Sequence, residues 1–156
     1  MIRIETERCK IRNFIESDID EFIIYRNNES WMQYQGFKGL SREEYKSALL
    51  KDSSLEVGIQ LAIVSKLNDG LIGDVYLNKS DNEYWIGYTI SPSYARQGYA
   101  YEVVKGVIEW LKKQGAMKVC AGVLPKNIPS IMLLEKLGFV YSEMDESGEK
   151  IYLLEL

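Results

Sequence analysis

Hydrophobic positions along the chain switch repeatedly between two spacings, every second residue and every three to four residues. These are the spacings of half-buried strands and of amphipathic helices. The strongest helical run extends from about Gly98 to Gln114 and ends in two lysines and Gly115, as helix C-termini often do. It predicts a helix that packs one face on a sheet, with an apolar stripe of Ala100, Val103, Val104, Val107, Ile108 and Leu111.

Shorter patterns predict the other elements. Capping residues indicate three more helices, from Ser17 or Asp18 to about Arg26, from Ser41, and from Asn127 to Leu137. Apolar runs bounded by turn residues predict the strands Cys9–Phe14, Gln60–Lys66, Leu71–Leu77, Glu83–Ile90, Lys118–Leu124, Phe139–Met144 and Ile151–Leu156. We expect an antiparallel meander in the middle, a β-α-β crossover after it and a closing hairpin. The predicted fold is one mixed α/β domain over residues 1–156, with a mostly antiparallel central sheet flanked by helices.

Composition excludes several classes of protein. The 156 residues contain no histidine, so Ser-His and Cys-His nucleophiles are excluded and no metal is expected. A net charge of −4 argues against nucleic-acid binding. The chain has no long apolar run and no signal-like start, so we expect a cytoplasmic protein that does not bind membranes. Cys9 and Cys120 are expected to be buried as small apolar residues.

The turn before the long helix has the features of an anion site. A strand-like run ends at Pro92, and Gly98 and Ala100 leave the backbone bare where the helix begins. The first N–H groups of a helix have no intrahelical acceptor, and the helix dipole favours negative charge there. The turn also follows the carboxyl end of a strand, where open α/β sheets bind ligands. Packing of small residues is the alternative explanation, and neither a Rossmann fingerprint nor a P-loop is present.

Two segments then resemble the GCN5-related N-acetyltransferases. Ser91-Pro-Ser-Tyr-Ala-Arg-Gln-Gly-Tyr-Ala-Tyr-Glu102 is similar to the acetyl-coenzyme A loop of that family, and Pro125-Lys-Asn-Ile-Pro-Ser-Ile-Met-Leu-Leu-Glu-Lys-Leu-Gly-Phe139 is similar to its second signature. The nearest branch contains the enzymes that acetylate the N-termini of ribosomal proteins. The resemblance implies acetyl-CoA as co-substrate and a splayed strand pair that forms the acyl-CoA cleft.

The resemblance also assigns coenzyme contacts. The strand end at Thr89 and Ile90 is implied to pair with the pantetheine arm, and Asn127 to bind the same arm as well as capping its helix. Ala95 stands where the family has Gln or Arg, which removes one side-chain contact. The implied phosphate loop consists of Arg96, Gln97, Gly98, Tyr99, Ala100 and Tyr101.

The family's usual tyrosine acid has no counterpart, because Leu134 stands at its position. Ser130 occupies the first turn of the same helix, as in the ribosomal-protein branch, and we predict that it hydrogen-bonds the coenzyme sulfur. A serine that only satisfies the backbone at a helix start is the alternative reading.

Transfer to an amine also requires a proton acceptor. An alkyl amine with a pKa of ~10.4 is neutral in only about one molecule in 2,500 at pH 7. Trp85 stands where the branch often has Glu, so Glu83, two residues earlier on the same strand face, is the predicted base. Asp74 and Glu149 are the alternatives.

The uncharged, aromatic segment Ser30–Phe37 lies where the family forms its acceptor cleft. Trp31, Tyr34 and Trp85 are therefore candidate acceptor contacts, with core packing as the alternative. The predicted function is transfer of an acetyl group from acetyl-CoA to a primary amine, either a small molecule or a peptide N-terminus, by direct attack. A catalytically inactive CoA-binding module is the second hypothesis, and either a monomer or a homodimer is compatible with the sequence.

Overall fold

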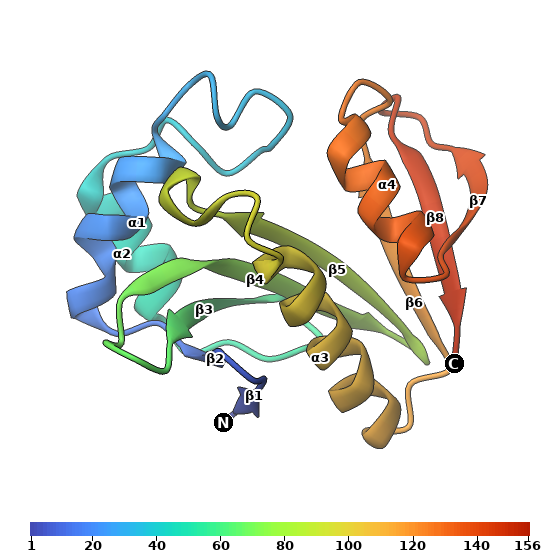
Figure 1. Ribbon diagram of the computed structural model, residues 1–156, viewed down its shortest axis with the longest axis horizontal. Helices are drawn as coiled ribbons and strands as arrows, with labels where there is room; N and C mark the ends of the chain where they lie inside the picture. Colours follow the sequence, from blue (N-terminus) through green and yellow to red (C-terminus); the bar gives the residue numbers. More distant parts are fainter.

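A sheet of eight strands forms the centre of the computed structural model, which describes residues 1–156, and four α-helices flank it (Figure 1). The strands are β1 (Ile4–Glu5), β2 (Cys9–Asn13), β3 (Ile59–Ser65), β4 (Leu71–Ser80), β5 (Glu83–Ile90), β6 (Lys118–Val123), β7 (Val140–Met144) and β8 (Lys150–Glu155). The helices are α1 (Ile19–Arg26), α2 (Arg42–Leu50), α3 (Tyr99–Lys113) and α4 (Ile128–Lys136), with short 3-10 turns at Glu16–Asp18 and Pro92–Tyr94. No helix is both long and apolar enough to span a membrane.

The strands lie in the order β1-β2-β3-β4-β5-β6-β8-β7. Neighbours are antiparallel except β5 and β6, which are parallel and connected through α3. The predicted mixed α/β class, central meander, crossover and closing hairpin are therefore confirmed. Strand β1 was not predicted, because its two residues are too few to show a period.

The sheet separates two hydrophobic cores. Leu61 and Ile63 of β3 face the larger core beneath α3 and α4, whereas Ala62 and Val64 face the smaller core beneath α1 and α2. Because the middle of β3 is covered on both faces, residues 61–64 are continuously apolar instead of alternating. The apolar stripe predicted for α3 enters the larger core through Val103, Val104, Val107, Ile108 and Leu111.

Helix starts agree only partly with the capping predictions. Ser41 caps α2 as expected, since its hydroxyl accepts from the Glu44 N–H at 3.2 Å and the Glu44 carboxylate accepts from the Ser41 N–H at 3.0 Å. Asp18, one of the two residues predicted to cap α1, stands at its N-cap position, but its side chain makes no capping hydrogen bond. The Asp18 carboxylate instead accepts from Arg12 at 2.7 Å and from a nearby backbone N–H, which joins the chain before α1 to β2.

Strands β5 and β6 pair only at one end. Their register covers Glu83 to Trp85 against Lys118 to Cys120. Beyond these residues β5 stays paired with β4 as far as Ile90, while β6 pairs only with β8. The sheet therefore opens between the carboxyl ends of β5 and β6, and we call this opening the fork (Figure 1). The splayed strand pair implied by the family resemblance is confirmed.

Both thiols are shielded in the folded protein, which gives a first prediction. Cys9 and Cys120 are free and at most 1% exposed, and burial raises the pKa of each to about 11. Since the thiolate is the reactive form, iodoacetamide at pH 8 should leave both residues unlabelled in the native protein and label both in urea, as measured by mass spectrometry. Alkylation of the native protein at the rate of a free cysteine would contradict this.

Candidate active site

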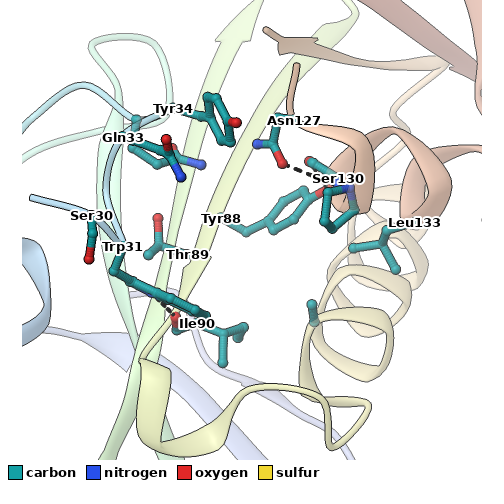
Figure 2. A pocket seen from close by; sticks show the side chains of 13 residues that line it. Ser30, Trp31, Gln33, Tyr34, Tyr88, Thr89, Ile90, Asn127, Ser130 and Leu133 are labelled. Carbon is teal, nitrogen blue, oxygen red and sulfur yellow. Dashed lines mark hydrogen bonds between the residues drawn. The ribbon is translucent and has the colours of Figure 1, made fainter. Parts of the chain in front are cut away.

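A cavity of about 320 Å³ lies in the fork. Its wall is formed by β5, by the first turn of α4, by Ala100 of α3 and by the loop between α1 and α2 (Figure 2). None of its lining residues is charged; they are Ser30, Trp31, Gln33, Tyr34, Gln35, Tyr88, Thr89, Ile90, Ala100, Asn127, Pro129, Ser130 and Leu133. The cavity thus brings together four segments that are distant in sequence, and seven of the residues predicted for the site.

The exposed edge of β5 carries free backbone groups. The Ser91 N–H donates to the Ile72 carbonyl at 2.7 Å, so the backbone of Ser91 and that of Thr89 point toward β4. The N–H and C=O groups of Tyr88 and Ile90 therefore point into the fork. This corrects one prediction: Tyr88 and Ile90, not Thr89, present the backbone to a ligand, while Thr89 only lines the cavity.

Tyr88 and Ser130 form a hydroxyl pair in the fork. Their oxygen atoms lie 2.8 Å apart, and Figure 2 shows the Tyr88 ring directed from β5 toward the start of α4. Burial raises the pKa of Tyr88 to about 12, so its hydroxyl stays protonated even at alkaline pH. Asn127 caps α4 by accepting from the Ser130 N–H at 3.4 Å, as its sequence position predicted. Tyr88 was not among the residues predicted for the site, although it immediately precedes Thr89 on the strand implied to bind the pantetheine arm.

The turn before α3 has backbone groups free to bind an anion. Gly98 adopts φ 81° and Arg96 φ 60°, left-handed conformations that turn the chain sharply into the helix. The N–H groups of residues 96–101 have no acceptor within the protein. Arg8 lies beside this turn, with its guanidinium 4.0 Å from the Tyr99 ring centre, and its charge is paired with that of Glu102 at 2.7 Å. The geometry fits the phosphate-binding role predicted for this turn.

Trp31 closes one side of the cavity. Its indole N–H donates to the Ile90 carbonyl at 2.8 Å, a contact drawn in Figure 2, and the side chain is 39% exposed. Tyr34 lines the same cavity from the same loop. Both residues therefore line the cavity, and their contact with the acceptor stays a prediction.

Glu83 and Trp85 lie away from the cavity. Both belong to the paired end of β5, opposite Lys118 and Cys120, and neither lines the fork. The Glu83 carboxylate pairs instead with Lys118 at 3.3 Å. Glu83 is five residues from Tyr88 along an extended strand, roughly 16 Å. The predictions of Glu83 as the base and of Trp85 as an acceptor contact were therefore wrong. Both residues lie at the end of β5 that is paired with β6, and the cavity lies at the other end of the strand.

Asp74 is also unsuited to proton transfer. It is 1% exposed and accepts from Tyr25, from Arg26 at 2.5 Å and from Gln60 at 2.5 Å. The carboxylate thereby holds α1 against β3 and β4. Its oxygens are fully used within the protein.

The fold and this site define a class of protein, and similarity to known proteins identifies that class. A family model described as acetyltransferase (GNAT) domain matches residues 8–140. The chain belongs to this family and is an N-acetyltransferase. It is 27% identical over 140 residues to the uncharacterized N-acetyltransferase YnaD of Bacillus subtilis (strain 168), covering 88% of this chain and 82% of YnaD.

Solved structures share the fold over nearly the whole chain. A GNAT-family acetyltransferase from Bacillus anthracis superimposes with a TM-score of 0.87 at 21% identity, covering 99% of this chain and 98% of that one. The ribosomal L7/L12 alpha-N-protein acetyltransferase RimL, solved in complex with coenzyme A, gives a TM-score of 0.83 at 15% identity, with coverage of 99% and 98%. These likenesses agree with the predicted fold, and nothing in them supports the alternative of an inactive module.

Proposed function

We propose that the protein transfers an acetyl group from acetyl-CoA to a primary amine at the fork. The observation that carries this proposal is the Tyr88–Ser130 hydroxyl pair, held beside the free backbone edge of β5 in an uncharged cavity. A fork with these groups suits an extended, largely uncharged chain that ends in a reactive carbonyl.

The coenzyme would lie along three sets of groups. The free N–H groups of residues 96–101, with Arg8 beside them, would bind the pyrophosphate through Arg96, Gln97, Gly98, Tyr99, Ala100 and Tyr101. The backbone of Ile90 and the side chain of Asn127 would bind the pantetheine arm from opposite walls of the fork. Because the Ile90 carbonyl now accepts from Trp31, coenzyme binding would displace or reposition that indole.

The reaction needs no covalent enzyme intermediate. Acetyl-CoA supplies the activated acetyl thioester. The Tyr88 N–H points into the fork and would stabilise the negative charge that develops on the carbonyl oxygen. The protonated hydroxyls of Tyr88 and Ser130 would hydrogen-bond the sulfur and deliver a proton to it as it leaves. The binding groups would hold the two substrates in line for direct attack.

Charges around the fork favour an acceptor with one amino group. A cavity of about 530 Å³ on the α1 and α2 side of the sheet is lined by two basic residues, Arg26 and Lys51, and by Asp74, which Arg26 already neutralises. A polyamine would therefore place its additional charges near Lys51 without an anionic partner. A peptide N-terminus or another monoamine with a neutral or acidic body fits better, and RimL, which shares the fold, is described as an alpha-N-protein acetyltransferase.

A panel of amines tests the proposal. With acetyl-CoA and a thiol-release assay, we expect kcat/KM for the amide of Ala-Ala-Ala to exceed that for spermidine by at least about tenfold, since a like-charge contact costs several kcal/mol. Acetyl-CoA binding is measured in parallel by calorimetry. Tight coenzyme binding without turnover of any amine would contradict the proposal, and a preference for spermidine would contradict the acceptor class.

A further inference from the structure

We propose that Glu149 binds the acceptor's ammonium group and takes its proton, an inference that rests on the function proposed above. Glu149 lies in the turn between β7 and β8, just before β8 begins. It lines a small cavity of about 90 Å³ that also includes Tyr34, Tyr88 and Ser130. The carboxylate thus shares a cavity with the hydroxyl pair that is proposed to meet the sulfur.

Gly122 leaves the space that Glu149 occupies. In β6, Ala121 and Val123 face the core beneath α3 and α4, so Gly122 faces the opposite side of the sheet. A Cβ atom at Gly122 would lie 3.0 Å from the Glu149 Oε1 atom. The carboxylate therefore lies over the backbone of Gly122, on the face of the sheet from which the acceptor would enter. Tyr88 packs against the larger core on the opposite face, where the coenzyme would bind.

Glu149 is the carboxylate of the fork that has no partner. None of the protein's ion pairs involves Glu149. Its hydrogen bonds, both with Asp145, are made by its backbone and not by its carboxylate. The cavity of about 320 Å³ has no charged lining residue, and the cavity of about 90 Å³ has none besides Glu149. Asp74, in the adjoining cavity, already accepts from Arg26. A substrate ammonium would find its only free counter-ion here.

The charged groups around Glu149 strengthen it as a proton acceptor. Burial raises the pKa of its carboxyl group, and the Asp145 carboxylate in the same turn adds to the effect. The adjacent Lys150 directs its ammonium to the Tyr141 ring, 5.6 Å from the ring centre. Lys126, after β6, is exposed, while the covering loop Tyr34–Gly36 and the first turn of α4 carry no charge.

With Glu149 in this role, both protons that leave the nitrogen during the transfer have an acceptor. The Glu149 carboxylate takes one proton from the ammonium and later releases it to solvent. The nitrogen lone pair forms the C–N bond as the C–S bond breaks. The second nitrogen proton reaches the sulfur through the hydroxyls of Ser130 and Tyr88, giving the amide and free thiol.

The test compares Glu149→Gln with Glu146→Gln, an exposed carboxylate in the same turn, using the amide of Ala-Ala-Ala as acceptor. Glu149→Gln should lower kcat/KM about a hundredfold at pH 7, and Glu146→Gln should have no effect. At pH 9 the loss should shrink roughly tenfold, because a peptide amine with a pKa of about 8 is then mostly neutral. Acetyl-CoA affinity should not change in either variant.

Gly122→Ala provides a second variant, because its methyl group pushes the carboxylate from its place. It should give a smaller loss with the same pH trend, and it carries the test if Glu149→Gln does not fold. Equal activity of Glu149→Gln and Glu146→Gln, or a loss that is the same at pH 7 and pH 9, would overturn the role of Glu149 while leaving the acetyl transfer intact. Absence of turnover by the wild-type protein with every amine would overturn both proposals.

Discussion

Turnover is expected to fall about a hundredfold when Tyr88 is replaced by phenylalanine. The substitution removes the hydroxyl that lies 2.8 Å from Ser130 but keeps the ring that packs against the larger core. Without it, the leaving sulfur loses a proton donor whose pKa burial holds near 12. Coenzyme affinity should not change, because the turn at residues 96–101, proposed to bind the pyrophosphate, and the Ile90 backbone are untouched.

Steady-state kinetics with the best amine of the panel would measure this, with Tyr84→Phe as the control. Tyr84 lies on the same strand and the same face, is 3% exposed, and makes no hydrogen bond through its hydroxyl at the paired end of β5. Ser130→Ala should resemble Tyr88→Phe, and the double variant should lose little more, since the two hydroxyls act as a unit. Full activity of both single variants would show that the pair has no part in the chemistry.

Replacing Asp74 by alanine is expected to lower the free energy of unfolding by about 3–5 kcal/mol. The Arg26 side chain is 3% exposed, and its Nε atom already lacks a hydrogen-bond partner, so removal of Asp74 leaves a buried, uncompensated charge. The aromatic rings around the guanidinium, Phe22 among them at 5.0 Å, do not replace the lost anion. The smaller core beneath α1 and α2 should loosen first.

Urea denaturation at neutral pH would measure the effect, with Asp20→Ala as a matched control. Asp20 pairs with Arg42 at 3.1 Å, but its side chain is 78% exposed, so its loss should cost at most about 1 kcal/mol. Replacing the buried pair together, by Arg26→Met and Asp74→Leu, should cost less than Asp74→Ala alone. Similar losses for Asp74→Ala and Asp20→Ala would contradict the structural role of the buried pair.

The sequence predicted the secondary structure closely wherever the determining forces are local. Strand Glu83–Ile90 was predicted to the residue, and the Ser41 capping box and the apolar stripe of α3 were found in their expected places. Caps, turns and periodic faces depend on residues a few positions apart, so the sequence alone reveals them. The same holds for the turn at Gly98, where left-handed backbone and a helix start lie side by side in the chain.

The chemistry of the fork was decided by tertiary structure. Glu83 was chosen by its strand face, but the pairing of β5 with β6 fixes which end of the strand is open, and no local pattern encodes that register. The contact between Tyr88 and Ser130 joins residues 42 positions apart, and Glu149 reaches the fork only because Gly122 on another strand has no side chain. The sequence by itself thus determined the elements other than β1, the turn at Gly98 and the family to which the chain is similar. Only the packing of β5, β6 and the last hairpin decided which carboxylate and which hydroxyls lie at the fork, because those contacts depend on distances that sequence spacing does not set.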